Sequence, residues 1–319
     1  MPLRTDGNAN PRGLRPATAA VVICSRDRPE MLERALAALQ RGVSDDAEII
    51  VVDSASRAPR TRAVAERAGV RYFRSDVPGL SIARNIGLRA TEREVVVYTD
   101  DDCEVAPDFL EQIVAPFSDP SIHAATGRLR DAHSEPPTLI AEETTVLRRI
   151  LDGLDAGHGA LMAVRRSSAV ATGGFDPILG AGRRFGGAED MDMLCRLIRS
   201  GGTVARVPGS VVTHVFTRED DDYVRLNTNY GLGLGAMCAK WRRMDAAAGR
   251  SLSIRVARRG ISRLVRRSRD TRTRTGQLAF LRGLVRGFSE ARRIPLDGQN
   301  FRDERPPAPV STESEGIIG

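Results

Sequence analysis

The sequence predicts an α/β fold: a mostly parallel, twisted sheet with helices on both faces, followed by a helical C-terminal region. Two observations predict it. Short, buried apolar runs alternate with helical patterns from Ala19 to about Gly127, an order typical of a parallel sheet that is covered on both faces. The chain has 319 residues, of which 41% are hydrophobic, and this is enough to fill one sizeable core.

The first half of the chain contains four predicted strands. They are Ala19–Cys24, Glu48–Asp53, Val70–Phe73 and Val95–Asp100. A helix is predicted from Pro29, since proline suits the first turn of a helix, and another over Leu80–Ala90. Ligands of such sheets bind beyond the carboxyl ends of the strands. We therefore expect Asp53 and the run Asp100-Asp101-Asp102 at one edge of the sheet.

The second half adds predicted elements around a glycine-rich loop. These are a helix over Leu139–Leu151, a strand over Gly159–Val164, the loop Gly180–Gly187, a helix over Glu189–Ser200 and a strand over Val211–Val215. Beyond Tyr223 the chain becomes helical and basic, and from Arg302 it is rich in Pro, Ser and Glu. We expect disordered tails at 1–17 and 301–319, a globular domain at 18–220 and a basic helical extension at 221–300.

The positive charge of the chain comes almost entirely from arginine. The net charge is +7, the isoelectric point is about 9.9, and Lys240 is the only lysine. A P-loop is excluded, because its motif requires a Gly-Lys pair. Schiff-base chemistry would depend on Lys240, which lies in a basic run away from the other motifs. Fourteen arginines from Arg250 to Arg293 indicate either a solvated face or contact with an anionic membrane or a phosphate-bearing acceptor.

The cysteines and the N-terminal segment predict a location. The four cysteines lie far apart without C-x-x-C spacing, which excludes a structural zinc site and a thioredoxin-like motif. Reduced thiols in a cytoplasmic protein are the simpler interpretation. Residues 1–16 contain no apolar segment, and no run of 18 apolar residues occurs, so neither a signal peptide nor a membrane span is predicted. We expect a cytoplasmic protein, with peripheral membrane contact through its basic helices.

The acidic run Asp100-Asp101-Asp102 is the motif with the clearest chemistry. Adjacent carboxylates repel one another by roughly 1 kcal/mol per close pair. A hard divalent cation offsets that repulsion, and carboxylate oxygens suit Mg²⁺ or Mn²⁺. The alternative is a solvated acidic turn. His214 is interpreted as a structural strand residue unless it converges on the acidic run.

Other polar positions allow two interpretations each. Asp53 is either a turn former or an acceptor for the hydroxyl groups of a nucleoside. Arg84 either pairs with phosphate, with Asn85 holding the backbone nearby, or is an exposed arginine on an ordinary helix. Asp190, which follows Glu189, is either a general base kept ionised by the helix dipole or a simple helix cap.

The order of these motifs resembles that of the family 2 glycosyltransferases, inverting enzymes with the GT-A fold. The resemblance covers about Ala19 to Phe216. Its segments are Ser25-Arg26-Asp27-Arg28-Pro29, Asp53, Gly79 to Gly87, Asp100 to Asp102, Gly159 to Arg166, Gly173 to Asp176, Glu189-Asp190 and His214. The resemblance implies a nucleotide-sugar-binding half at 18–128 and an acceptor half at 129–220. It also implies a UDP-sugar donor and an acceptor that is a small molecule, lipid-linked or carrier-bound.

The resemblance further implies a role for each site residue. Asp102 would hold Mn²⁺ or Mg²⁺ directly, with Asp100 in the metal shell or near the ribose and His214 as a further ligand. Asp190 would be the catalytic base, beside Glu189. The donor-binding positions implied are Ser25, Arg26, Asp27, Asp53, Arg84, Asn85, Asp100 and Asp101.

The sequence departs from the processive members of the family in two ways. Their Gln-x-x-Arg-Trp signature is absent, with Trp241 in a different context, and no predicted membrane span follows. Both departures favour transfer of a single sugar. A nucleotidyltransferase is one alternative, but Ser25–Pro29 lacks the glycine-rich phosphate loop that it needs. A basic nucleic-acid-binding protein is the other. It explains the charge but not aspartates at buried strand ends, which repel phosphate, so no nucleic-acid partner is expected.

Overall fold

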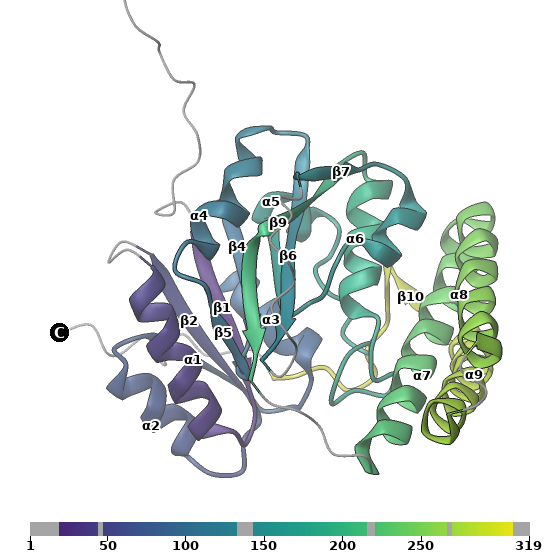
Figure 1. The fold of residues 1–319 in the computed structure, drawn as a ribbon, viewed down its shortest axis with the longest axis horizontal. Coiled ribbons are helices and arrows are strands. Elements are labelled where there is room, and N and C mark those ends of the chain that lie inside the picture. The colour runs from purple at the N-terminus through teal and green to yellow at the C-terminus, as the bar shows by residue number, and fades with distance from the viewer. Residues whose placement is uncertain (1–18, 44–46, 133–142, 216–220, 267–269, 309–319) are drawn as a thin grey trace, which may run out of the picture.

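The computed structural model describes residues 19–43, 47–132, 143–215, 221–266 and 270–308. Its centre is a nine-stranded sheet of order β3-β2-β1-β4-β8-β6-β9-β5, with β7 also paired to β9 (Figure 1). The strands are β1 Ala19–Ser25, β2 Glu48–Ser54, β3 Arg71–Ser75, β4 Val95–Asp100, β5 Cys103–Val105, β6 Ile122–Asp131, β7 Thr145–Leu147, β8 Leu161–Arg165 and β9 Thr203–His214. Only β5, β7 and β8 run against the other six strands. The predicted mostly parallel sheet is therefore confirmed.

Helices cover both faces of this sheet. One face carries α1 Pro29–Gly42, α2 Arg60–Arg67, α4 Phe109–Val114 and the 3₁₀ turn η2 Ala115–Ser118. The other carries α3 Leu80–Arg89, α5 Arg166–Ala171 and α6 Glu189–Arg199. The reason is visible in β1, where Val21 packs into one core and Val22 into the other. A strand that is apolar on both faces is stable only when both are covered.

Helix α3 lies unusually close to the centre of the sheet. A Cβ atom on Gly87 would lie 2.4 Å from Cγ1 of Val22 in β1, so only glycine permits this approach. The same helix carries Arg84 and Asn85, both buried. The close packing therefore fixes these two polar side chains beneath the carboxyl ends of the strands.

The C-terminal region is helical, as predicted. It consists of α7 Asp221–Met244, α8 Ala246–Arg266 and α9 Thr271–Ala291, followed by a hairpin of β10 Leu296–Asp297 and β11 Asn300–Phe301. Figure 1 shows the three helices as a layer beside α6, with α8 and α9 farthest from the sheet. Helices α7 and α9 are in backbone contact, since a Cβ on Gly231 would lie 2.1 Å from the carbonyl oxygen of Phe280. Across the described residues, no helix combines the length and apolar character needed to cross a membrane.

Two sequence predictions are wrong in the described residues. The helix expected over Leu139–Leu151 is replaced by β7 and the 3₁₀ helix η3 Ile150–Asp155, because the β-branched segment at Thr145–Leu147 pairs with β9. The tail expected from residue 301 is wrong for its first residue, since Phe301 is only 1% exposed and packs against Phe185. The tail predicted at 1–17, residues 139–142 of the predicted helix and residues 309–319 lie outside the described residues.

Candidate active site

The carboxyl ends of β1, β2 and β4 bring polar residues to one edge of the sheet. In the strand register, Ser25 is paired with Asp53, and Cys24 is paired with Asp100. Strand β1 lies between β2 and β4, so the two aspartates flank it on opposite sides. This is the edge at which the sequence predicted that they would meet.

The acidic run continues into a cluster of potential metal ligands. The pairing of β5 with β9 sets Cys103 opposite His214, and Nε2 of His214 lies 3.4 Å from Oδ2 of Asp102. Potential ligand atoms of Asp100, Asp102 and Cys103 all lie within 4.8 Å of one another. His214 therefore converges on the acidic run, which is the condition under which the sequence favoured a ligand role for it.

Asp101 makes different contacts from its two neighbours. Its Oδ2 accepts a hydrogen bond of 2.7 Å from the hydroxyl of Ser25, and its Oδ1 accepts one of 3.1 Å from Nη1 of Arg28. The same Nη1 lies 3.2 Å from Oδ2 of Asp102. Burial raises the pKa of Asp101 to about 6, although Arg28 opposes this rise. The sequence analysis missed Arg28 as a site residue, and the available signal was its place directly after β1.

Arg84 connects the acidic run to helix α6. Its guanidinium donates 3.1 Å to Oε1 of Glu189 and 3.0 Å to the carbonyl oxygen of Gly159, and it lies 3.6 Å from Oδ1 of Asp100. The side chain is only 2% exposed, and it also lies over the ring of Phe175. The alternative of an exposed arginine on an ordinary helix is therefore wrong, and contact of Arg84 with phosphate stays a prediction. Arg84 positions Asp100 and Glu189 relative to each other.

The first turn of α6 presents two carboxylates to the same site. Ala188, at the N-cap, has a φ of 69° and turns the chain into the helix. Oδ2 of Asp190 accepts a hydrogen bond of 2.9 Å from the backbone N–H of Gly159. Burial, and then Asp190, raise the pKa of Glu189 to about 7, while Arg84 opposes the rise. Asp190 is thus held by the backbone at a helix N-terminus, where a carboxylate is favoured.

The charges in this site do not balance. Five carboxylates meet two guanidinium groups, and the residues are Asp100, Asp101, Asp102, Glu189 and Asp190 with Arg28 and Arg84. A formal excess of negative charge at a partly buried edge is costly unless a cation joins it. Carboxylate oxygens with a nearby imidazole form a donor set that suits Mn²⁺ or Mg²⁺. The residues present therefore fit a divalent cation.

Asp53 is enclosed by its own turn. Its Oδ1 accepts 2.7 Å from the N–H of Ser56, and its Oδ2 accepts 2.8 Å from the hydroxyl of Tyr72 and 2.9 Å from Nη1 of Arg74. Of the two interpretations left open by the sequence, these bonds match the turn former. The half-exposed side chains of Arg74 and Tyr72 lie at the surface in its place, and sequence reasoning did not single them out.

The other residues predicted on the donor side are partly exposed and partly buried. Arg26 and Asp27 are exposed, and Oδ1 of Asp27 accepts 2.7 Å from the N–H of Arg57. Asn85 is buried and exchanges two hydrogen bonds of 2.8 Å with the backbone of Phe175. Asn85 therefore ties α3 to the turn at 173–176, in keeping with the backbone-holding role expected for it.

A second cluster of charges lies behind the site, around Lys240 in α7. Its Nζ lies 2.6 Å from Oδ2 of Asp176 and 2.8 Å from Oδ2 of Asp192. Arg196 also pairs with Asp192, at 2.8 Å, and Trp241 donates 3.0 Å to the same carboxylate. Burial alone would raise the pKa of Asp192, but Lys240 and Arg196 hold it below its ordinary value.

This cluster corrects the interpretation of Lys240. The sequence placed it away from every motif, yet it joins the turn that ends at Asp176 to the helix that begins with Glu189. The physical reason is the packing of α7 on α6, which buries Lys240 and Trp241 completely. The C-terminal helices are therefore part of the support of the site.

The family model for "Glycosyl transferase family 2" matches residues 20–166, from β1 to the start of α5. The match covers less than half of the 319 residues, and in this part the chain is similar to the family 2 glycosyltransferases. The matched region contains the acidic run, Arg28 and Arg84. Glu189, Asp190 and His214 follow it in the sequence, and Arg84 and the β5–β9 pairing connect them to it.

Curated relatives of the chain include the pre-mycofactocin glycosyltransferases of Mycobacterium tuberculosis strains CDC 1551 / Oshkosh and H37Rv, each 26% identical over 241 residues. The alignment covers 69% of this chain and 47% of each relative. The chain thus spans about half the length of the curated relatives that it matches.

Solved structures show the same fold at low sequence identity. The mannosyltransferase PcManGT from Pyrobaculum calidifontis, in complex with GDP-Man and Mn²⁺, has a TM-score of 0.60 at 17% identity, over 86% of this chain and 87% of that one. GalNAc-T7, with UDP, GalNAc and Mn²⁺, has a TM-score of 0.50 at 23% identity, over 63% of this chain and 44% of that one. These likenesses show that the chain shares the fold of the two solved structures.

Proposed function

We propose that this chain is an inverting, metal-dependent, non-processive glycosyltransferase that moves one sugar from a nucleotide-sugar to an acceptor. One observation carries the proposal. The metal-ligand candidates at the end of β4 and the base candidate at the start of α6 share one site, joined by Arg84 through Asp100, Glu189 and Gly159. Transfer of a glycosyl group requires such a convergence, because the leaving group and the nucleophile must meet at one carbon atom.

A divalent cation belongs to this proposal. Asp102 and Asp100 would hold it, with His214 beside Asp102 as a further ligand. When bound, Mn²⁺ or Mg²⁺ would stabilise negative charge on the leaving diphosphate. Support comes from the excess of carboxylates in the site and from the two solved structures of the same fold, both of which contain Mn²⁺.

Asp190 is proposed as the general base. Its carboxylate would take the proton from the acceptor hydroxyl while that oxygen forms a bond to the anomeric carbon of the donor. The bond between the anomeric carbon and the phosphate oxygen breaks, and the nucleoside diphosphate leaves with the electron pair. Because the nucleophile enters opposite the leaving group, the configuration inverts. The hydrogen bond from Gly159 orients the carboxylate for this step, and Glu189 with Arg84 fixes the first turn of the helix.

The donor is proposed to be a UDP-sugar, bound along the ends of β1 and β2. Ser25, Arg26, Asp27, Asp53, Arg84, Asn85, Asp100 and Asp101 stay in the proposal as the donor side, with Arg84, Asn85 and Asp53 as positioning residues. The solved relatives differ here, since one is described with GDP-Man and the other with UDP. A competition between UDP and GDP therefore discriminates directly between two nucleosides.

The acceptor stays open among small molecules, lipid-linked groups and carrier-bound groups. Single transfer is proposed because the processive signature is absent from the sequence. Four free cysteines support a cytoplasmic location, and the charge of the basic C-terminal helices supports peripheral contact with an anionic membrane.

The proposal is tested by ligand-dependent thermal stability and by turnover. UDP with Mn²⁺ should raise the unfolding midpoint of the full chain more than UDP or Mn²⁺ alone, and a panel of nucleotide-sugars should reveal slow donor hydrolysis. Asp102→Asn should lose the metal-dependent part of the shift. A nucleotidyltransferase would release pyrophosphate from a nucleoside triphosphate instead. Stabilisation by duplex DNA alone, with none by any nucleotide, would contradict the proposal.

A further inference from the structure

Helix α8 exposes large aliphatic side chains beside arginine on the side that faces away from the protein. Ile254, Ile261 and Val265 are 58%, 53% and 67% exposed, and their spacing of 7 and 4 residues places them on one stripe of the helix. The opposite side of α8 packs into the core through Leu252 and Val256. A solvent-facing stripe of three large aliphatic side chains on a helix that already buries its other side is unusual.

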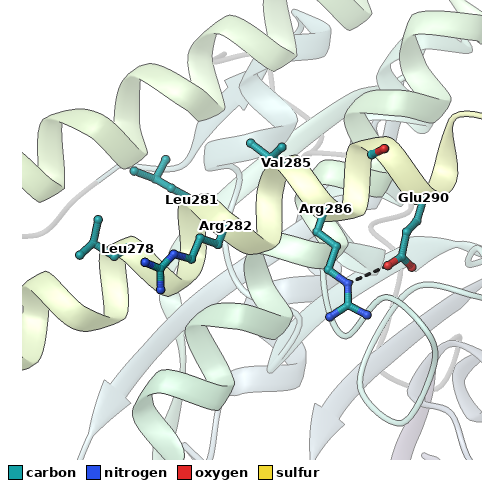
Figure 2. Close-up of a pocket in the computed structure, with 7 residues that line it drawn as sticks. Leu278, Leu281, Arg282, Val285, Arg286 and Glu290 are labelled. Atoms are coloured by element: carbon teal, nitrogen blue, oxygen red, sulfur yellow. Dashed lines mark hydrogen bonds and ion pairs between the residues drawn. The ribbon is translucent and has the colours of Figure 1, made fainter.

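Helix α9 continues this apolar surface. Val285 is 71% exposed and Leu278 is 39% exposed, and both line a shallow groove together with Leu281, Arg282, Arg286, Ser289 and Glu290. Figure 2 shows Leu281 and Val285 on one side of α9 and the guanidinium groups of Arg282 and Arg286 on the other. A Cβ on Gly260 of α8 would lie 2.7 Å from Cδ2 of Leu281, so the apolar side of α9 adjoins α8.

The two helices also carry more positive charge than the whole chain. Together α8 and α9 contain ten arginines and one glutamate, a net charge of +9, and α8 has no acidic residue. The chain as a whole has a net charge of +7, so the remainder is slightly negative. The two helices lie in one outer layer of the molecule (Figure 1). Exposed aliphatic side chains flanked by arginine are typical of helices that bind at a membrane interface.

We propose that this α8–α9 face, formed by Ile254, Ile261, Val265, Leu278 and Val285 with the flanking Arg258, Arg282 and Arg286, docks on an anionic lipid surface. The aliphatic side chains enter the boundary between headgroups and acyl chains, and the arginines pair with lipid phosphate. This refines the membrane part of the proposed function by naming the face and adding insertion to charge. It does not depend on sugar transfer.

Two other occupants fit the face less well. A second copy of the chain would set the arginines of one face, Arg258, Arg282 and Arg286, against the same arginines of another, and like charges at an interface disfavour association. Nucleic acid would engage the arginines but leave the aliphatic stripe in water. The chain contains only 4% aromatic residues for the stacking that single-stranded binding uses. An anionic bilayer satisfies both the arginines and the aliphatic side chains.

The test is flotation of the full chain with phosphatidylcholine vesicles, with or without phosphatidylglycerol. We expect binding only to the vesicles that contain phosphatidylglycerol. The triple variant Ile254→Ser, Ile261→Ser, Val265→Ser should weaken binding by more than about tenfold, because each buried aliphatic side chain contributes to insertion. Arg258→Gln should weaken it about fivefold at low salt. Asp190→Asn should bind as the wild type does, which separates this test from that of the transfer activity.

Matched controls lie elsewhere on the surface. Val170, which is 49% exposed on α5, is a comparable aliphatic side chain, and Arg41 is an exposed arginine on α1. Val170→Ser and Arg41→Gln should leave flotation unchanged, whereas Val285→Ser should weaken it. No binding of the wild type to either vesicle would overturn the proposal, as would equal losses in Val170→Ser and Val285→Ser. Self-association or DNA binding that Val285→Ser abolishes, without vesicle binding, would equally overturn it.

Discussion

Two clusters of carboxylates lie on opposite sides of the start of α6, and they solve the problem of buried charge differently. Around Lys240, two aspartates meet two cations, because Asp176 and Asp192 are paired with Lys240 and Arg196. At the strand ends, five carboxylates meet only Arg28 and Arg84. The charges of the first cluster balance within the protein, and we call it the closed cluster. The second, which we call the open cluster, keeps an excess of negative charge that a divalent cation would offset.

This difference in charge balance distinguishes a structural cluster, around Lys240, from a candidate functional site at the strand ends. In the cluster around Lys240, the carboxylates of Asp176 and Asp192 accept hydrogen bonds from several donors. These bonds hold α7, α6 and the turn at Asp176 in one arrangement. At the strand ends, burial raises the pKa values of Asp101 and Glu189, and the nearby carboxylates add to the rise, as in a site that binds a cation. The predictions below change one cluster at a time.

The largest effect is expected from Asp190→Asn. Transfer should fall by about 10²–10⁴-fold, because the amide cannot accept the proton of the acceptor hydroxyl. Donor-dependent thermal shifts should stay near those of the wild type. Initial rates of sugar transfer measure the effect, with Asp108→Asn, an exposed aspartate at the start of α4, as the control. Near-normal turnover of Asp190→Asn would remove it from the mechanism.

A substitution in the closed cluster around Lys240 should lower the stability of the protein more than the loss of an exposed ion pair. Lys240→Met should lower the free energy of unfolding by about 3–5 kcal/mol, since it leaves two aspartates buried without their shared cation. Urea denaturation gives the value. Arg62→Met breaks an exposed pair with Glu66 and should cost less than about 1 kcal/mol. Similar losses in the two variants would contradict the structural role given to Lys240.

The open cluster should respond to divalent cations, and the closed one should not. Mn²⁺ at about a hundred times its dissociation constant should stabilise the wild type by about 3 kcal/mol. Asp102→Asn should lose most of that gain, whereas Asp176→Asn should keep it, although its starting stability is lower. Differential scanning calorimetry with added Mn²⁺ or Mg²⁺ is the measurement. An equal gain in all three proteins would show that the cation binds elsewhere.

The smallest expected effect is a dependence on pH with opposite signs in the two clusters. The pKa of Glu189 is raised to about 7 in the fold, so its contribution is present below its unfolded pKa and is lost as the pH rises through 7. The pKa of Asp192 is lowered, so its contribution is present above its unfolded pKa and is lost as the pH falls.

Urea denaturation between pH 5 and 8, with a chelator present, measures how the free energy of unfolding changes as Glu189 titrates. Glu189→Gln should flatten, by about 1–2 kcal/mol, the decline that the wild type shows as the pH rises from about 5 to 7. An unchanged slope in that variant would mean that Glu189 does not carry the raised pKa.

Much of the donor half followed from local pattern. The strands at β1, β2 and β4 were predictable because runs of β-branched residues end in a polar side chain, and Pro29 marks the start of α1. The helix predicted over Leu139–Leu151 was wrong because Thr145–Leu147 forms a strand that pairs with β9, and β9 lies far away in the sequence. Arg28 was missed because its partners, Asp101 and Asp102, lie more than 70 residues away.

The sequence by itself determined the alternation of strands and helices, the acidic run after β4 and the carboxylates that open α6, because periodicity and helix-start signals act over a few residues. Only the tertiary structure decided which charges are paired. Arg84 became a buried positioning residue, Asp53 closed its own turn, and Lys240 entered the core beside Asp192. Such outcomes depend on contacts between distant segments and on the burial that these contacts create, and no local pattern records them.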